Sequence, residues 1–105
     1  MAEDTSYVVM AYIFHKDKLL LTYHRNLDKW LPVGGHVERG ESFQEALRRE
    51  VREEVSLTAV SFHHALSPPE QSKTQEQPTP FHVQRTQHRD AEETILEFKA
   101  SLDKA

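Results

Sequence analysis

Residues 35–57 constrain this chain more than any other segment. All three glycines of the sequence lie at its start or just before it, and a stretch with the spacing of a helix follows. Glu50, Glu53 and Glu54 stand three and four positions apart, so they project from one face of that helix. Carboxylates held this close repel one another unless a cation sits among them. The segment therefore predicts a glycine loop, a helix and an oxygen-ligand site for Mg²⁺.

The predicted helix covers residues 42–55. Ser42 is a suitable N-cap, and Glu45 three positions later makes a capping box available. An apolar stripe follows helical spacing and consists of Phe43, Leu47, Val51 and Val55. On the same helical wheel Glu54 falls within this stripe, and Glu50 and Glu53 border it. An acid on a core-facing stripe is costly unless a cation compensates it, so we expect an inward-facing acidic site.

Length and composition exclude several classes of protein. A chain of 105 residues suits one domain, residues 1–105, with a modest core. The net charge of −4 leaves no basic surface for a nucleic acid polymer. The absence of cysteine excludes disulfides and thiolate chemistry. No apolar run approaches the roughly 20 residues of a membrane span, so no membrane partner is expected and a cytoplasmic location is the default.

The remaining segments read mostly as strands. Apolar, β-rich composition predicts strands over residues 7–14, 19–23, 57–66 and 81–88, with the first two forming a hairpin. Residues 67–80 are rich in proline and glutamine and predict a flexible loop. The last segment, from residue 90 onward, fits both helical and alternating spacing. Periodicity alone therefore leaves helix and strand open there.

Residues 35–57 resemble the signature of the Nudix hydrolases, a family of pyrophosphohydrolases. The positions that fall on the signature are Gly35, Glu41, Arg49, Glu50, Val51, Glu53, Glu54 and Leu57. Ser56 is the one departure, because the family has glycine there. That glycine lies just past the helix, where a left-handed backbone is common, so serine should cost about 1 kcal/mol without removing a ligand.

The resemblance implies an α/β (α+β) fold. A mixed β-sheet would be packed by helices in an α/β/α sandwich, with the last segment as a strand. The chain has only a short C-terminal part and does not supply the further helix that the family usually has there. An exposed sheet face would then favour a homodimer.

The resemblance also implies an enzyme that hydrolyses the diphosphate linkage of a nucleoside diphosphate-linked small molecule. Mg²⁺, with Mn²⁺ as an alternative, would be held by Glu50, Glu53 and Glu54. Glu53 and Glu50 would carry the catalysis with Arg49, which orients the glutamates through ion pairs. Gly34 and Gly35 would let the backbone approach metal and phosphates, and Glu41 would brace the loop. Arg25, which precedes the glycine loop, would bind the phosphates. The alternative is that Arg25 is an ordinary surface charge.

Two questions stay open at this point. The general base is either Glu53, acting on a metal-bound water, or a group from later in the chain, with His88, Glu92 and Glu93 as candidates. The function is either pyrophosphohydrolysis or nucleotide binding on the same fold with little catalysis. A protein-interaction domain with a solvated acidic helix is a third reading.

Overall fold

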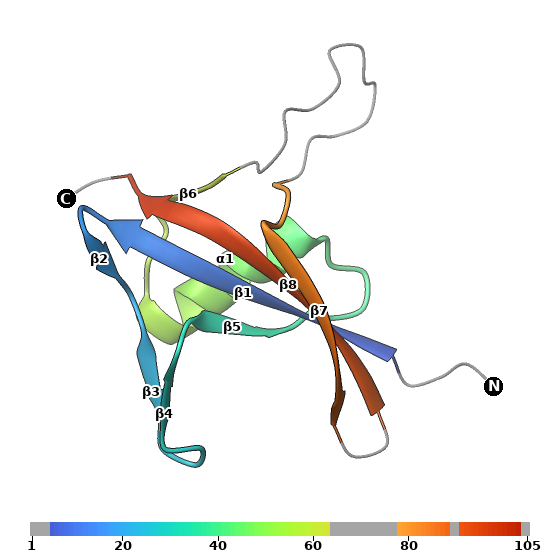
Figure 1. The fold of residues 1–105 in the computed structure, drawn as a ribbon. Coiled ribbons are helices and arrows are strands. Elements are labelled where there is room, and N and C mark those ends of the chain that lie inside the picture. Colours follow the sequence, from blue (N-terminus) through green and yellow to red (C-terminus); the bar gives the residue numbers. More distant parts are fainter. Residues whose placement is uncertain (1–4, 64–77, 89–90, 104–105) are drawn as a thin grey trace, which may run out of the picture.

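The computed structural model describes residues 5–63, 78–88 and 91–103. Its elements, in chain order, are β1 (Thr5–His15), β2 (Lys18–Leu19), β3 (Thr22–His24), β4 (Lys29–Leu31), β5 (Val33–His36), α1 (Phe43–Val55), β6 (Val60–Phe62), β7 (His82–His88) and β8 (Ala91–Leu102). Six strands form one mixed sheet, and β3 pairs with β4 in a separate two-stranded sheet that projects from it (Figure 1). No helix of the described residues is both long and apolar enough to cross a membrane.

The first and last strands form the centre of the main sheet. β1 and β8 run parallel, in a register that extends from Thr5 opposite Glu92 to Phe14 opposite Ser101. On the far side of β1, the short strands β2 and β5 pair antiparallel with it. On the far side of β8, β6 and β7 pair antiparallel with that strand. β5, which carries the glycine pair, therefore lies directly beside the central strand β1.

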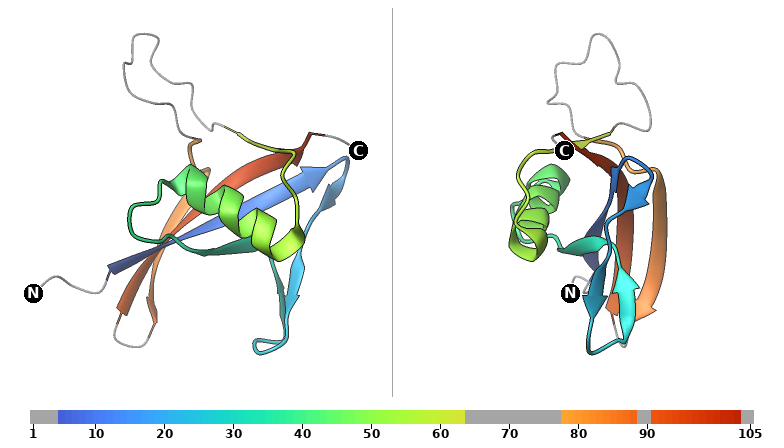
Figure 2. Two further views of the ribbon diagram at one scale, coloured as in Figure 1. Left: turned by 180° about the vertical axis from the view of Figure 1, so that it is seen from behind. Right: turned by 90° about the vertical axis from the view of Figure 1, so that its left-hand side faces the viewer.

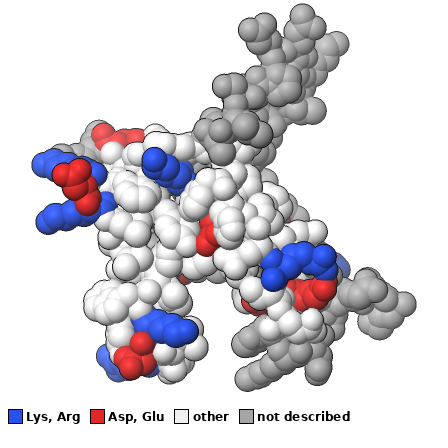
Figure 3. Space-filling view, in the orientation of Figure 1, with Lys and Arg blue, Asp and Glu red and all other residues white. Residues whose placement is uncertain are grey.

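The core lies between one face of this sheet and α1. Alternate residues of β1 and β8 point to that face, in cross-strand pairs such as Val9 with Leu96 and Ala11 with Phe98. The helix contributes its own buried side chains, which are Ala46, Leu47 and Val51. Figure 2 shows α1 lying across this one face of the sheet. Uncharged side chains dominate the middle of the opposite face, which Figure 3 shows.

Several of the elements predicted from the sequence are confirmed. A helix spans Phe43–Val55, and strands cover residues 5–15 and 82–88. The ambiguous last segment is the long strand β8, because its alternating residues Leu96, Phe98 and Ala100 fill the core beside β1. The mixed α+β architecture is also confirmed. The described residues supply one helix, which covers one face of the sheet, so the second helical layer is not seen in this part of the chain.

Two predicted strands were wrong in extent. Residues 19–23 were expected to form a single hairpin strand, but only Lys18–Leu19 pairs with β1. The chain then turns away from β1, and Thr22–His24 pairs with β4. In this pair the ring centroids of Tyr23 and Trp30 lie 5.3 Å apart. The strand expected over residues 57–66 is only Val60–Phe62 among the described residues. Residues 64–66 of that predicted strand and residues 67–77 of the expected flexible loop lie outside the described residues.

Candidate functional site

Local interactions fix the ends of α1 and so the positions of its glutamates. Ser42 is the N-cap: its hydroxyl accepts from the Glu45 amide at 3.1 Å, and the Glu45 carboxylate accepts from the Ser42 amide at 2.8 Å. The predicted capping box is therefore confirmed. At the other end Ser56 adopts the left-handed conformation, with φ 59° and ψ 34°. The helix ends there, so Glu53 and Glu54 lie in its last turn.

The glycine pair of β5 brings its backbone against two neighbours. A Cβ added to Gly34 would lie 2.2 Å from the carbonyl oxygen of Val9. A Cβ added to Gly35 would lie 2.3 Å from Oε2 of Glu50. Backbone atoms therefore exclude a side chain at Gly34, and a side chain at Gly35 would have to displace the Glu50 carboxylate. The glycine pair therefore lies in strand β5 and not in the predicted loop, and Gly35 directly contacts the predicted acid Glu50.

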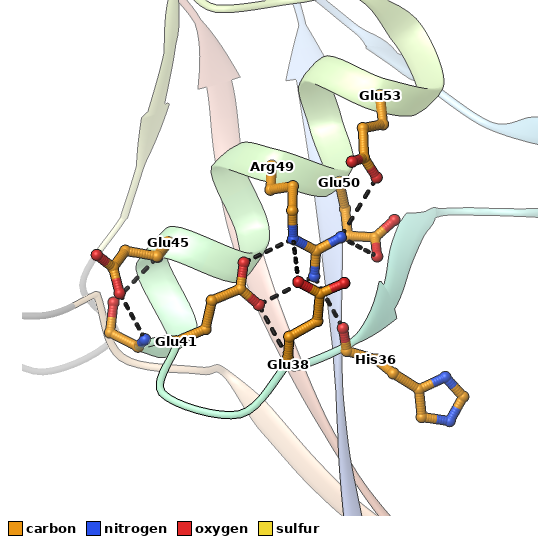
Figure 4. A network of polar contacts seen from close by, with 8 residues as sticks. His36, Glu38, Glu41, Glu45, Arg49, Glu50 and Glu53 are labelled. Atoms are coloured by element: carbon orange, nitrogen blue, oxygen red, sulfur yellow. Dashed lines mark hydrogen bonds and ion pairs between the residues drawn. The ribbon is translucent and has the colours of Figure 1, made fainter.

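Arg49 is the centre of a polar network between the loop and the helix (Figure 4). Its guanidinium donates to both carboxylate oxygens of Glu41, with Nε at 2.6 Å and Nη2 at 3.0 Å. Nη2 also donates to the carbonyl oxygen of His36 at 3.0 Å. Nη1 donates to Glu50 at 3.0 Å and to Glu53 at 3.3 Å. Such a fork sets the orientation of two of the three signature glutamates.

Glu41 ties this network back to the loop. Its Oε1 accepts from the amide of Glu38 at 2.9 Å while both oxygens face Arg49. The hydrogen bond from Arg49 is the main cause that holds the pKa of the Glu41 carboxyl below its usual range. In turn, the hydrogen bond to Glu41, followed by that to Glu50, raises the pKa of the Arg49 guanidinium. Both groups therefore stay charged, and the geometry fits the bracing role expected of Glu41.

The prediction that Glu54 faces the core was wrong. The residue is exposed, although Leu47 and Val51 on the same side of the helix are buried. Its carboxyl group nevertheless lies against Glu50 and the backbone of Gly34. Loss of solvent, then the hydrogen bond and charge of Glu50, raise the pKa of Glu54 to about 7. The side chain thus lies at the edge of the helix, beside β5, and not between the helix and the sheet.

The three glutamates do not form a ready-made metal cage. Among the described residues, no group of three acidic, histidine or cysteine side chains is arranged to hold a metal ion. Arg49 neutralises Glu50 and Glu53 instead, and Glu54 is left against Glu50 with a raised pKa. An acid pair whose charges are incompletely compensated is chemically suited to a cation. The donor set therefore fits a hard divalent ion, although the side chains would have to converge on it.

Of the other predicted site residues, some lie near the signature residues and others do not. Glu93 reaches the loop, since its Oε2 lies 2.8 Å from Nε2 of His36. Glu92 is paired with Arg85, whose Nη2 lies 2.6 Å from both of its oxygens. The side chain of His88 is outside the described residues. Arg25 lies exposed in the turn that joins β3 to β4, and no interaction of the described residues brings it to the glutamates.

Sequence reasoning missed two groups of polar residues. His36 and Glu38 both contact Arg49, and their places directly after the glycine pair were the signal that could have found them. The second group surrounds Glu97, a buried acid on β8 that binds Tyr12 and His82. Its members come from three strands, so no spacing in the sequence connects them.

Comparison with known proteins places the chain in a family. Residues 4–101 match the model of the NUDIX domain. A NUDIX-family hydrolase from Clostridium perfringens is similar at 27% identity and a TM-score of 0.78, over 93% of this chain and 69% of that one. The C. elegans Ap4A hydrolase is similar at 19% identity and a TM-score of 0.65, over 96% and 69%.

The E. coli dihydroneopterin triphosphate pyrophosphohydrolase is similar at 19% identity and a TM-score of 0.69, over 94% and 69%. At such identities the last two likenesses show a shared fold. No curated protein matches the chain. The match to the domain model covers nearly the whole chain, including the glycine loop and the acidic helix. The chain therefore belongs to the Nudix hydrolase family.

Proposed function

We propose that this protein hydrolyses the diphosphate linkage of a nucleoside diphosphate derivative in a reaction that depends on Mg²⁺ or Mn²⁺. The observation that carries the proposal is the placement of Glu50. It lies against the side-chain-free position of Gly35 and is held from the other side by Arg49. A carboxylate fixed in this way between a loop backbone and a guanidinium suits the binding of a cation that also holds phosphate oxygens.

Glu50, Glu53 and Glu54 would hold the ion, with a backbone carbonyl of Gly34 or Gly35 as a further oxygen ligand. Once bound, the ion supplies neutralisation of phosphate charge and activation of a water molecule. The signature glutamates differ in how far their side chains are exposed to solvent. Glu50 is nearly enclosed, with 14% of its side chain exposed, whereas Glu53 is 57% exposed.

Glu53 is the residue we assign to the attacking water. Its contact with Arg49 at 3.3 Å is longer than that of Glu50 at 3.0 Å, so it is the less tightly held of the two. An exposed carboxylate one turn from Glu50 can accept a proton while Arg49 keeps its neighbours in place. Glu93 is the alternative base, because its contact with His36 brings it to the loop that follows Gly35.

Phosphoanhydrides also appear in the names of two structural neighbours, an Ap4A hydrolase and a dihydroneopterin triphosphate pyrophosphohydrolase. A test panel should therefore contain dinucleoside polyphosphates and nucleoside triphosphates beside ADP-ribose and nucleotide sugars. Release of phosphate or nucleotide is measured with Mg²⁺, with Mn²⁺ and with a chelator. We expect turnover of at least one member that is abolished by the chelator.

Glu53→Gln is the variant that tests the residue assignment. It should lower kcat by at least about a hundredfold if Glu53 acts on the water. Glu45→Gln is the matched control, because it makes the same change on the same helix and glutamine still completes a capping box. Equal activity of wild type and Glu53→Gln would refute this assignment, and an inert panel would refute hydrolysis itself.

Nucleotide binding with little catalysis is the second candidate function. It is favoured by the way Arg49 engages two of the three acids, which leaves no preformed metal cage among the described residues. Calorimetry with the same panel separates the two candidates. Binding without product, at any metal concentration, would support the second.

A further inference from the structure

Glu97 is a buried acid on the face of the sheet opposite α1. It is the one buried polar or charged residue of the described part of the chain, with 6% of its surface exposed. Its neighbours Leu96 and Phe98 point into the core, so the side chain of Glu97 points to the other face. Burying a carboxylate is costly unless hydrogen bonds compensate it. Its partners therefore indicate what the cluster does.

Tyr12 and His82 take one carboxylate oxygen each. The Tyr12 hydroxyl donates to Oε2 at 2.6 Å, and Nδ1 of His82 contacts Oε1. Since a carboxylate only accepts hydrogen bonds, Nδ1 is the donor. In the neutral form of the ring Nε2 is then the acceptor, on a side chain that is 56% exposed. Burial, followed by the hydrogen bond to Glu97, raises the pKa of Tyr12 to about 12, so this hydroxyl stays a donor.

Phe81 adds an exposed ring to the cluster. Its amide donates to the carbonyl oxygen of Glu97 at 2.8 Å, and its ring meets that of Tyr12 edge-on with centroids 5.3 Å apart. Half of the residue, 52%, remains exposed. Glu97 and Tyr12 thus hold two accessible groups, an apolar ring and an imidazole acceptor, side by side at one end of the open face.

Strand register connects this cluster to the glycine loop. Met10 of β1 lies opposite Gly34 on β5 and opposite Glu97 on β8, so the three residues form one row across the sheet. Two strand spacings separate Gly34 from Glu97, roughly 10 Å. Met10 lies between them, and Val8 and Ile95 form the next row on the same face; all three are apolar and half-buried. That span is about the length of a nucleoside whose phosphates lie at the loop.

We infer that His82 is a specificity-determining residue: its Nε2 accepts a hydrogen bond from the exocyclic amino group of a nucleobase that packs beside Phe81. Glu97 and Tyr12 are positioning residues, which fix the ring of His82 and its tautomer. The inference rests on the proposed function only for the idea that the diphosphate carries a nucleoside. It names the substrate class more closely, as derivatives of the amino-bearing purines adenine and guanine.

The test uses binding alone, without metal or hydrolysis. Two matched pairs of 5′-monophosphates are titrated into the protein in EDTA and followed by NMR. Those of adenosine and purine riboside differ only in the 6-amino group, and those of guanosine and inosine only in the 2-amino group. We expect wild type to bind the amino-bearing member of at least one pair roughly fivefold more tightly, the effect of one hydrogen bond.

His82→Phe, which keeps a flat ring, should bring that ratio close to one. Glu97→Gln should reduce it, because an amide can also donate to Nδ1 and so release the tautomer. Asp103→Asn is the control: it makes the same kind of change just beyond β8, where the carboxylate binds Ser61, and should leave the ratio unchanged. Melting temperatures are recorded for each variant, since a merely structural role would change them without changing the ratio.

Equal binding within both pairs, no binding of any monophosphate, or an unchanged ratio in His82→Phe would overturn the inference. The cluster would then only anchor the beginning of β7 on β8. Because no diphosphate is present, this failure is independent of the hydrolysis panel. An active enzyme can fail this test, and a protein inert toward the panel can pass it.

Discussion

Gly35 and Glu50 are so close that no side chain fits between them. A Cβ on Gly35 would lie 2.3 Å from Oε2 and 2.5 Å from Cδ of Glu50. Arg49 holds the same carboxylate from the other side at 3.0 Å. The glycine before the acidic helix is therefore needed for space. Its backbone forms one wall of the place where the acid sits.

Gly35→Ala should displace Glu50 and disable the site. A methyl group at this position must push the Glu50 carboxylate away, because its Cβ would lie 2.3 Å from Oε2 of Glu50. We expect Mg²⁺-dependent kcat/KM to fall at least about tenfold, the usual effect of disturbing the surroundings of a metal ligand. Steady-state kinetics across a Mg²⁺ titration gives the measurement.

Gly40→Ala is the control for that variant. No atom lies within 4 Å of a Cβ there, but φ is +83°, so alanine is strained and should cost about 1 kcal/mol of stability. Activity at a temperature well below unfolding should stay as in wild type. If Gly35→Ala kept its full metal response, the contact with Glu50 would have no functional weight.

Arg49→Lys should weaken metal binding while preserving charge. Lysine cannot reproduce the fork that reaches Glu41, Glu50 and the carbonyl oxygen of His36. The apparent Mg²⁺ affinity should fall roughly tenfold to a hundredfold. Arg48→Lys is the matched variant, because the adjacent guanidinium lies over Phe62 and binds the carbonyl oxygen of Val60. Similar metal affinities for the two variants would contradict the role given to Arg49.

The pH dependence of stabilisation by Mg²⁺ should follow the titration of the Glu54 carboxyl group. Its pKa is raised to about 7 in the folded protein, chiefly by the partial loss of solvent around its carboxyl group and by Glu50. An acid whose pKa is raised in the folded state stabilises the fold at pH values below its unfolded pKa. This contribution is lost as the pH rises through about 7. Metal binding needs the ionised form, so the increase in melting temperature caused by Mg²⁺ should be larger at about pH 8 than at about pH 6.

Glu54→Gln should flatten that difference, because the amide does not titrate in this range. Glu45→Gln, at an exposed position in the first turn of α1, should retain it. The measurement is a series of thermal melts with and without Mg²⁺ at each pH. A Mg²⁺ effect that is independent of pH in the wild type would rule out Glu54 as a ligand whose proton competes with the ion.

Ser56→Gly should stabilise the protein. Ser56 has φ 59° and ψ 34°, the left-handed conformation that glycine adopts without strain. The gain should be about 1 kcal/mol in the free energy of unfolding, read from urea denaturation. Ser56→Ala separates the causes, because it removes the hydroxyl but keeps the strained backbone. A gain of the same size in both variants would exclude strain as the reason.

Local chemistry explains what could be predicted. The start of the helix followed from Ser42 and Glu45, which interact within one turn. The family resemblance implied the pairing of Arg49 with Glu53, which also lies within one turn of the helix. The place of Glu54 was misjudged because a helical wheel shows direction around the axis but not where the sheet beneath it ends. β5, beside which Glu54 lies, pairs only with β1 among the described strands.

The sequence by itself determined the family, the acidic helix and the loop that precedes it, since each depends on residues close together in the chain. Only the tertiary structure decided that Gly35 forms a wall for Glu50 and that Glu93 reaches His36. It also placed Tyr12 on Glu97, 85 positions away, through the parallel pairing of the first and last strands. Such contacts depend on the register between distant strands, which no local spacing encodes.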